Sequence, residues 1–425
     1  MKSIKKIVAI FLIVFLVAGV FAGCSKKDGG GENTESAEQT NGAPADFKVG
    51  FILLNDENSN YDLNFINAAK EACKEIGIPN ENILIKTFVD QSDACYKAAM
   101  ELVDEGCKFI FADSFGHEEY MIRAAKAATN VQFFHATGTK AHTEGLANYH
   151  NAFASIYEGR YLAGIAAGMK LNELKDAEQL NTKPPKMGYV GAFPSAEVKS
   201  GYTAFYLGAK SVCPDVTMEV IFTNSWYDEA AEEAAANKLI ARKCDLISQH
   251  ADSMGAPTAC ERAGIANVSY NGSTVDTCPK TFIVSSKINW APYMVLAMTN
   301  TIQGKETEKD WVGTVKTGSV ELTEINEQAA AKGTKEAIEA AKVELIAGTR
   351  HVFDVKNFTV TVSDRQNMNA KVDKNGVLTS YTADVDDMGD AKGDTEVVKD
   401  GYFQESVFRS APYFDIDIDG ISILD

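Results

Sequence analysis

An alternation of short apolar runs with helical patterns fills residues 186–271, and it constrains the fold more than any other feature. Four apolar runs, KMGYVGAF, MEVIFTN, DLISQH and ANVSYN, are separated by three segments whose apolar residues have helical spacing. Strands that alternate with helices in this way form an open parallel sheet. Ligands bind at the carboxyl ends of the strands in such sheets. We therefore expect the residues that follow these strands to face one ligand site.

The same alternation precedes this stretch. Apolar runs at FKVGFILLND, NILIKTFVD, CKFIFADSFG and VQFFHATG alternate with helical patterns, and a last strand and helix follow at TFIVSSKINW and residues 291–303. Two such groups predict two α/β lobes, each a doubly wound parallel sheet, joined by hinge crossovers. We expect residues 47–155 and 288–350 to form lobe 1 and residues 156–287 to form lobe 2.

The C-terminal part has a different pattern. From residue 351 onward, apolar residues alternate with polar ones between Asp/Gly turns, which is typical of short strands. We therefore expect a β-rich C-terminal extension over residues 351–425. Two lobes joined by crossovers are the architecture of a periplasmic-type binding protein, which closes by a hinge motion around its ligand.

The N-terminal segment predicts export and a membrane anchor. Three lysines precede an unbroken apolar run over residues 7–20, which closes with Phe-Ala-Gly-Cys. This arrangement is typical of a secretory signal over residues 1–23, followed by a cysteine that is lipidated, Cys24. The run is too short to span a bilayer comfortably. Residues 24–46 are rich in Gly, Glu, Ser and Thr, so we expect them to form a flexible tether.

Charge and cysteine content restrict the partners. The formal net charge is −18, which argues against nucleic acid or an anionic membrane surface as a partner. No CxxC or zinc spacing occurs, so we expect no metal site and no cofactor. Cys213 and Cys244 flank one predicted strand and could form a disulfide. The acidic stretch at residues 384–390 does not fit the EF-hand spacing, and we expect a solvated loop there.

Residues 159–170 (GRYLAGIAAGMK) form a helical pattern with an unusual number of small residues. In a membrane protein, such residues can form a packing face between helices. Here we expect a helix that is buried closely against a sheet, with Tyr161, Leu162 and Ile165 in the core.

Several short motifs resemble one family of binding proteins. VGAFPSAEV, FTNSWYDEAAE, ISQHADS, SYN and KINWAPY occur in this order, preceded by ADSFGHEEYM, FFHATG and IYEGRYLAGIAAG. Their order and spacing are similar to those of the basic membrane lipoprotein (BMP) family of substrate-binding proteins. The resemblance implies a class B (type I) periplasmic-binding-protein fold with three crossovers, which delivers a purine nucleobase or nucleoside to an ABC permease. The branch with Trp in NSWYD and His-x-Asp in QHADS looks like the one associated with free purine bases.

A purine offers two flat faces and an edge of hydrogen-bond donors and acceptors. Aromatic rings suit the faces, at about 1–3 kcal/mol per stacked base, and carboxylates and amides suit the edge. Phe115 and Trp226 follow predicted strands in different lobes and could sandwich a base as the lobes close. Together with the resemblance, these considerations predict a ligand site formed by Tyr61, Asn64, Ser114, Phe115, Phe193, Glu197, Trp226, Asp252, Asn271, Lys287 and Trp290.

Structural roles for the same residues stay open at this point. Trp226 could be a core aromatic that caps a strand, and Trp290 could pack near the hinge. Asp252 could cap the helix that follows it. His135 and His250 both end predicted strands, and we expect each to be a hydrogen-bonded structural group.

The function class follows from what the motifs offer. No GxSxG, Walker loop or GxGxxG occurs in the required context, so we expect a binding protein and not an enzyme. We expect a monomer that is anchored by lipid on the extracytoplasmic face of the cell membrane. Two alternatives remain: the same fold with a sugar or a signal molecule as ligand, or a surface lipoprotein or sensor partner without a transport role.

Overall fold

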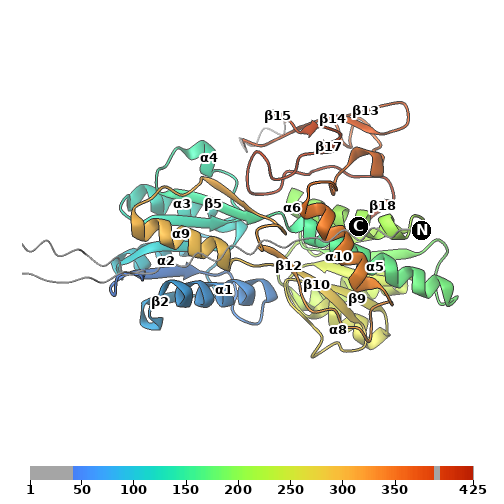
Figure 1. Cartoon of the computed structure of the whole chain (residues 1–425), viewed down its shortest axis with the longest axis horizontal. Coiled ribbons are helices and arrows are strands. Elements are labelled where there is room, and N and C mark those ends of the chain that lie inside the picture. The colour runs from blue at the N-terminus through green and yellow to red at the C-terminus, as the bar shows by residue number, and fades with distance from the viewer. Residues whose placement is uncertain (1–41, 387–392, 425) are drawn as a thin grey trace, which may run out of the picture. The chain divides into compact units, whose positions relative to one another are not determined.

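The computed structural model describes residues 42–386 and 393–424. The predicted signal sequence, Cys24 and most of the predicted tether lie outside the described residues. Residues 42–425 form one compact unit, which contains two lobes and a C-terminal extension (Figure 1).

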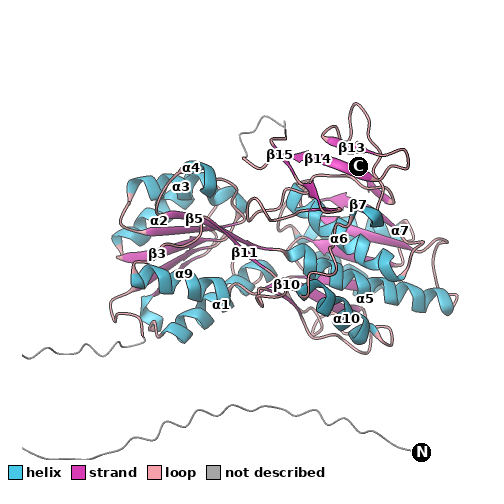
Figure 2. Cartoon of the chain, turned by 45° about the horizontal axis from the view of Figure 1, so that its top comes forward, coloured by secondary structure: helices cyan, strands magenta, loops and turns pink. Residues whose placement is uncertain are grey.

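Lobe 1 is built on a six-stranded parallel sheet, which lies to the left in Figure 2. Its strand order is β11 (Asp310–Gly313), β5 (Tyr149–Ala154), β4 (Gln132–Ala136), β3 (Cys107–Ala112), β1 (Lys48–Ile52) and β2 (Ile83–Lys86). One face is covered by α1 (Asn60–Ile76) and α9 (Ala291–Gln303), and the other by α2 (Asp93–Asp104) and α3 (Glu118–Ala127). The strands are mostly apolar because both of their faces are buried.

Lobe 2 is built on a seven-stranded sheet in which all pairs except the one with β12 are parallel. Its strand order is β12 (Val320–Leu322), β10 (Phe282–Ile288), β9 (Ala266–Tyr270), β8 (Leu246–His250), β6 (Lys186–Gly191), β7 (Thr217–Phe222) and β18 (Ile421–Leu424). One face carries α5 (Ile156–Asp176), α6 (Ala196–Val212) and α10 (Thr334–Ile346), and the other carries α7 (Glu229–Ala241) and α8 (Gly255–Ala263).

The chain crosses between the lobes three times. It passes from β5 into α5, from β10 into α9, and from β11 into β12. The last crossover differs from the expected boundaries, because β12 and α10 lie in lobe 2, whereas the sequence predicts residues 288–350 in lobe 1. Short edge strands such as β12 carry little information about which sheet they join, since their partners are distant in sequence.

The C-terminal extension is only partly separate from the lobes. Its strands are short and form two small antiparallel sheets: β13 (Ala370–Val372) with β14 (Leu378–Ala383) and β15 (Thr395–Glu396), and β16 (Val398–Lys399) with β17 (Tyr402–Phe403). The chain then returns to lobe 2, where β18 pairs in parallel with β7. The sequence predicts a β-rich extension over residues 351–425, and its last strand completes the sheet of lobe 2 (Figure 1).

The small residues of α5 allow two helices to approach closely. A Cβ atom on Gly164 would lie 2.1 Å from the carbonyl oxygen of Phe205 in α6, and one on Gly168 would lie 2.5 Å from that of Ala209. The helix also packs against the sheet of lobe 2, as the sequence predicts: a Cβ atom on Gly159 would lie 2.8 Å from Val320 in β12. Tyr161 is buried, as the sequence also predicts.

Two further predictions concern membranes and disulfides. Within the described part of the chain, no helix is long and apolar enough to cross a membrane. Cys213 and Cys244 are both buried and free, so the structure does not form the disulfide that their spacing allows.

Candidate ligand site between the lobes

Strands of both lobes end at one cleft. The carboxyl ends of parallel strands meet at the same edge of a sheet, and here the two edges face each other. We call the space between them the inner cavity. It is lined by Leu54, Asn55, Tyr61, Asp62, Asp113, Ser114, Phe115 and Thr137 from lobe 1, and by Glu197, Trp226, His250, Asp252 and Tyr270 from lobe 2.

The backbone turns sharply where it enters this cleft. Thr137, Asn224 and Asn271 each follow a strand and adopt left-handed conformations, with φ of 71°, 58° and 61°. Asparagine tolerates this region, but a β-branched residue such as Thr137 does so at a cost of about 1–3 kcal/mol. Backbone outliers of this kind cluster at functional sites, so the observation supports a ligand site here.

Aromatic rings from both lobes line the inner cavity. On the lobe 2 wall, the ring of Trp226 lies 5.3 Å from that of Phe193 and 6.5 Å from that of His250, measured between centroids. The ring of His250 in turn lies 4.3 Å from that of Tyr270. Phe115 comes from lobe 1 and is 49% exposed, and it shares the inner cavity with Trp226. The predicted pair of rings from opposite lobes therefore lines one common space.

Four carboxylates surround the same space. Burial raises the pKa of Asp113 well above its ordinary value, and the nearby Asp62 raises it further. Burial likewise raises the pKa of Asp252, again with a contribution from Asp62. Glu197 completes the group, and the lining contains no lysine or arginine among the described residues. The cavity is therefore rich in carboxyl groups, and those of Asp113 and Asp252 keep their protons to a higher pH than ordinary aspartates do.

Hydrogen bonds hold these carboxylates in place. Oδ1 of Asp113 accepts from the backbone N–H of Leu54 at 3.1 Å, and Oδ1 of Asp62 accepts from that of Asn55 at 2.8 Å. The Tyr61 hydroxyl donates to the backbone carbonyl of Asp113 at 2.7 Å. The loop after β1 is thus tied to the loop after β3, and the lobe 1 wall is pre-formed.

Several buried polar atoms around the cavity have no hydrogen-bond partner among the described residues. They are Oδ2 of Asp113, Oγ1 of Thr137, both ring nitrogens of His250, Oδ1 of Asn271 and Oγ of Ser195. A buried polar atom without a partner costs about 1–3 kcal/mol. Native proteins contain few such atoms, so those at this cleft are available to a polar ligand.

The site has two compartments of different size. The inner cavity measures about 30 Å³, which is room for a water molecule rather than for a purine. It continues through Phe115, Thr137, Glu197 and Trp226 into a larger space of about 470 Å³, which we call the outer pocket. The outer pocket has the size of an ordinary small-molecule site. The lining rings must separate before a planar ligand enters the inner cavity, as hinge motion of two lobes would allow.

The predicted site residues divide into groups. The inner cavity is lined by Tyr61, Ser114, Phe115, Glu197, Trp226 and Asp252. Phe193 lines the outer pocket. A separate surface pocket contains Asn64, Asn271 and Lys287.

The surface pocket does not share its lining with the inner cavity. Nζ of Lys287 lies 3.1 Å from a carboxylate oxygen of Glu321, and the Asn64 side chain donates to the carbonyl of Ile288. These two residues therefore have partners within the protein. Asn271 is closer to the inner cavity, since its side-chain amide donates to Asp252 at 3.4 Å.

The prediction for Trp290 is wrong. Its side chain is fully buried and packs in the core of lobe 1, with ring centroids 5.3 Å from Phe65 and 6.1 Å from Phe111. Trp290 stands at the start of α9, directly after the crossover from β10. The sequence places it correctly beside the hinge, but the direction of its side chain depends on how α9 packs in lobe 1.

Sequence reasoning missed several residues that line the inner cavity: Asn55, Asp62, Asp113, Thr137, His250 and Tyr270. The sequence predicts a hydrogen-bonded His250, but neither of its nitrogens has a hydrogen-bond partner in the described part of the protein. His135 does conform, since its Nε2 lies 2.7 Å from the carbonyl oxygen of Ser114. Most of the missed residues lie at or near the carboxyl ends of strands. The expectation that residues after such ends face the ligand, which located Trp226, could therefore have located most of them.

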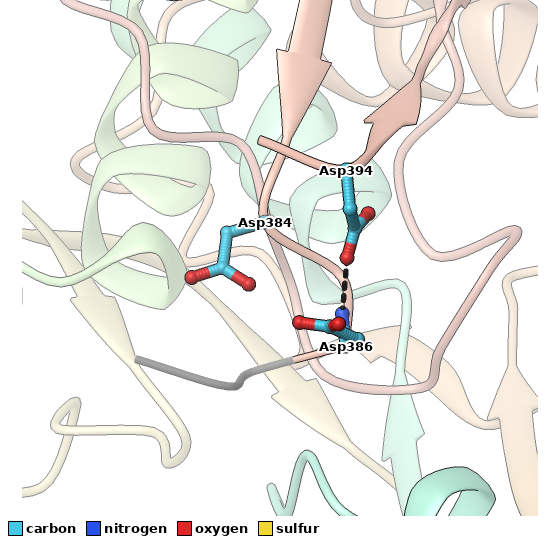
Figure 3. A group of neighbouring side chains, drawn as sticks. All are labelled: Asp384, Asp386 and Asp394. Carbon is cyan, nitrogen blue, oxygen red and sulfur yellow. Dashed lines mark hydrogen bonds between the residues drawn. The ribbon is translucent and has the colours of Figure 1, made fainter. Parts of the chain in front are cut away.

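The acidic stretch at residues 384–390, for which the sequence predicts a solvated loop, is described only at residues 384–386. Figure 3 shows the carboxyl groups of Asp384, Asp386 and Asp394 close together. Oδ2 of Asp394 accepts from the backbone N–H of Asp386 at 2.9 Å. Residues 387–392 of this stretch lie outside the described residues.

Comparisons with known proteins agree with this geometry. An ABC transporter system solute-binding protein from Aeropyrum pernix K1 has a similar structure, with a TM-score of 0.61 at 15% identity over 75% of this chain and 94% of that one. This similarity confirms the predicted fold class of two α/β lobes.

Two relatives are similar in sequence. A protein named purine-binding protein BAB2_0673 from Brucella abortus is 30% identical over 277 residues, which are 65% of this chain and 74% of the relative. A protein named putative ABC transporter glucose-binding protein TsgA13 from Haloferax volcanii is 33% identical over 205 residues, about half of each chain (48% and 49%). The family model described as PnrA-like ABC transporter substrate-binding protein matches residues 51–350, and the chain therefore belongs to this Bmp family.

Proposed function

We propose that this protein is a lipid-anchored receptor on the extracytoplasmic face of the cell membrane. It captures a purine, either a nucleobase such as adenine or a nucleoside, and delivers it to an ABC importer. The observation that carries the proposal is that Phe115 and Trp226 come from opposite lobes and line one cavity together with buried carboxylates. The name of the Brucella relative, purine-binding protein, supports it.

The two rings suit the flat faces of a purine. When the lobes separate, a planar base enters between Phe115 and Trp226, and closure brings one ring onto each face. Each stacked base–ring contact contributes about 1–3 kcal/mol. The remaining rings of the lobe 2 wall, Phe193 and His250, fix the orientation of the Trp226 indole by packing against it.

The acidic lining suits the edge of a purine. Asp113 and Asp252 accept hydrogen bonds from ring N–H and exocyclic amino groups when ionised, and each can donate one when protonated. The neutral imidazole of His250 adds one donor and one acceptor. Among the described residues, the lining of the inner cavity offers no lysine or arginine to pair with a phosphate, so we expect nucleosides and bases to bind and nucleotides to be rejected.

Calorimetry tests the proposal directly. The chain from residue 24 onward, carrying Cys24→Ser, is titrated with adenine, guanine, hypoxanthine, their ribosides and AMP. At least one base or riboside binds, AMP does not, and Trp226→Ala weakens binding at least about fivefold. Phe88→Ala removes another aromatic ring, one that is 67% exposed and does not line the site, and it leaves binding unchanged. Failure of every purine to bind overturns the proposed ligand.

A sugar is the second candidate ligand. One relative is named as a glucose-binding protein, and rings combined with carboxylates also suit a pyranose. The sugar lacks a flat face of π-electrons, so its binding depends less on a two-sided ring sandwich. Glucose, ribose and galactose titrated under the same conditions separate the two candidates.

The lipid anchor requires its own test. Acylation of Cys24 would hold the protein on the membrane after cleavage of residues 1–23. Wild-type protein is expected in the membrane fraction, and Cys24→Ala is expected to be released into the medium or to keep its signal sequence. Equal membrane association and equal mobility of the two proteins would contradict the anchor.

A further inference from the structure

We propose that residues 409–412 of the C-terminal extension form a third wall of the ligand site, and that their contact with Asp310 holds the two lobes closed. This segment lies outside the stretch that the family model matches, residues 51–350. The identity of the ligand rests on the proposed function, whereas the contact between the segment and lobe 1 does not.

The outer pocket has walls from three parts of the chain. Lobe 1 contributes Gln91, Phe115, Thr137 and Thr139, and lobe 2 contributes Phe193, Ser195, Ala196, Glu197 and Trp226. The third wall consists of Arg409, Ala411 and Pro412. Both rings that are proposed to hold the ligand therefore share a pocket with the extension. A ligand that enters or fills the outer pocket must contact this segment.

The segment has a fixed conformation. The buried carboxylate of Glu405 accepts from the backbone N–H groups of Tyr413 and Phe414, both at 2.8 Å. The Arg409 guanidinium donates to the carbonyls of Ala411 at 3.2 Å and Pro412 at 3.1 Å. These bonds cross the base of the segment and stabilise its turn. The wall is thus pre-formed and does not need a ligand to order it.

The segment is attached firmly to lobe 2. On its C-terminal side, β18 continues the sheet of lobe 2 beside β7. Asp415 and Asp417 lie between the segment and β18 in the chain. Nζ of Lys199 in α6 lies 2.7 Å from a carboxylate oxygen of Asp415 and 3.3 Å from one of Asp417. Helix α6 begins at the cleft, next to Glu197. Residues 409–412 therefore move with lobe 2 in any hinge motion.

The segment contacts lobe 1 through Asp310. Oδ1 of Asp310, the first residue of β11, accepts from the backbone N–H of Ser410 at 3.0 Å and from its hydroxyl at 2.8 Å. Oδ2 of the same carboxylate lies 3.1 Å from Nδ1 of His142, which belongs to lobe 1. Separation of the lobes breaks both bonds to Ser410. Bonds to a charged acceptor are stronger than neutral ones, so they favour the closed arrangement.

The contact with Asp310 and the third wall affect different properties of ligand binding: the first affects the affinity for all ligands, and the second affects the discrimination between them. Because a ligand binds the closed arrangement, the contact with Asp310 raises the apparent affinity for every ligand by the same factor. The wall instead discriminates between ligands, because the small side chain of Ala411 leaves room that a larger one would remove. Ala411 is therefore a specificity-determining residue, and Ser410 is a positioning residue.

Distance measurement between the lobes tests the contact. Spin labels are placed at Asp90→Cys and Glu229→Cys, two exposed positions at the cleft edges of lobes 1 and 2, in the chain from residue 24 onward with Cys24→Ser. The native cysteines of the described part are buried. Without ligand, Ser410→Ala increases the population of long distances at least about threefold, because it removes one charge-assisted hydrogen bond. Ser406→Ala is the matched control: its hydroxyl has no partner among the described residues, and its distances equal those of wild type.

Equal distance distributions for Ser410→Ala and wild type would overturn the proposed contact. This readout needs no ligand, so it stands even where no purine binds and the proposed function fails. Where a purine binds, Ser410→Ala also weakens every bound purine by the same factor, about three- to tenfold.

Calorimetry tests the wall. Ala411→Leu reduces the outer pocket and weakens ligand binding at least about tenfold, with a larger loss for ribosides than for bases. Val407→Leu enlarges a side chain that is 61% exposed and lies outside the pocket lining, and it leaves binding unchanged. Thermal unfolding of both variants verifies that they fold. If Ala411→Leu bound every ligand of the protein with wild-type affinity, residues 409–412 would not belong to the site.

Discussion

Nε2 of His250 lies 3.7 Å from Oε1 of Glu197, and both side chains line the inner cavity. This distance is too long for a hydrogen bond. Burial lowers the pKa of His250, and the neighbouring Glu197 only partly opposes this effect. The imidazole is therefore neutral at pH 7, with both nitrogens left for a ligand.

The first prediction follows from this arrangement. His250→Leu removes two buried nitrogens that have no hydrogen-bond partner among the described residues, so we expect the free energy of unfolding to stay at or above the wild-type value. Purine affinity should fall at least about tenfold. Urea unfolding and calorimetry measure the two effects separately. His117→Leu is the matched control, because Nε2 of His117 lies 2.8 Å from the carbonyl oxygen of Val89, and its loss should cost about 1–3 kcal/mol. Equal destabilisation by both substitutions would contradict a ligand-binding role for His250.

The second prediction concerns pH. Burial raises the pKa of Asp113 in the folded protein, so the folded state binds more protons than the unfolded state between the ordinary aspartate pKa and the raised value. Stability contributed by this group is present below its ordinary pKa and is lost as pH rises through the raised pKa. Each tenfold change in the acid dissociation constant on folding is equivalent to about 1.4 kcal/mol of stability.

Asp113→Asn abolishes this titration while keeping an oxygen that can accept from Leu54. We expect the variant to be more stable than wild type at pH 8 and the advantage to shrink toward pH 5, as measured by urea unfolding at both values. A ligand that binds the protonated carboxyl should keep its affinity in this variant, since the amide also offers a donor and an acceptor. A stability difference that is independent of pH would show that Asp113 is ionised in the folded state.

The sequence predicts those parts of the structure that depend on local patterns. The strands and helices of both lobes follow from alternating apolar runs, and the family resemblance is confirmed by the family match to residues 51–350. Membership of a family of substrate-binding proteins also agrees with the expectation that the chain is a binding protein and not an enzyme. Strand-end position located Trp226 and Asp252 at the inner cavity.

The features that the sequence missed depend on distant contacts. Asp62 lies within α1, and it reaches the site only because its carboxylate turns back to the backbone of Asn55. The direction of Trp290 is set by the packing of α9. Pairing of β18 with β7 joins residues about 200 positions apart, and no local pattern encodes such a partner.

A third prediction tests the close approach of α5 and α6. Gly164→Ala places a Cβ atom 2.1 Å from the carbonyl oxygen of Phe205, so the two helices must move apart. We expect a loss of about 3 kcal/mol or more, since overpacking of a core usually costs about 1–3 kcal/mol and here the obstacle is backbone. Gly42→Ala is the matched control, because no atom lies within 4 Å of the added Cβ atom. Urea unfolding of both variants measures the difference, and a wild-type value for Gly164→Ala would contradict the helix contact.

The last prediction concerns Arg160, a buried cation behind the lobe 2 wall. Its guanidinium donates to the hydroxyls of Tyr189 at 2.9 Å and Ser248 at 2.8 Å, and it lies over the ring of Tyr270 at 5.3 Å. Tyr270 lines the inner cavity, so Arg160 supports the site from below without contacting it. The planar fork makes contacts that the single ammonium group of lysine cannot reproduce.

We therefore expect Arg160→Lys to cost about 3 kcal/mol in unfolding free energy, because it leaves buried hydroxyls and a charge with poorer partners. Arg242→Lys is the control: Arg242 pairs with Glu219 at the surface, where water can replace a lost bond, so we expect a smaller loss than for Arg160→Lys. The folded fraction of Arg160→Lys should also bind purine more weakly, since the ring of Tyr270 loses its support. Calorimetry at a temperature where the variant is folded separates this effect from unfolding, and unchanged affinity there would restrict Arg160 to a role in stability.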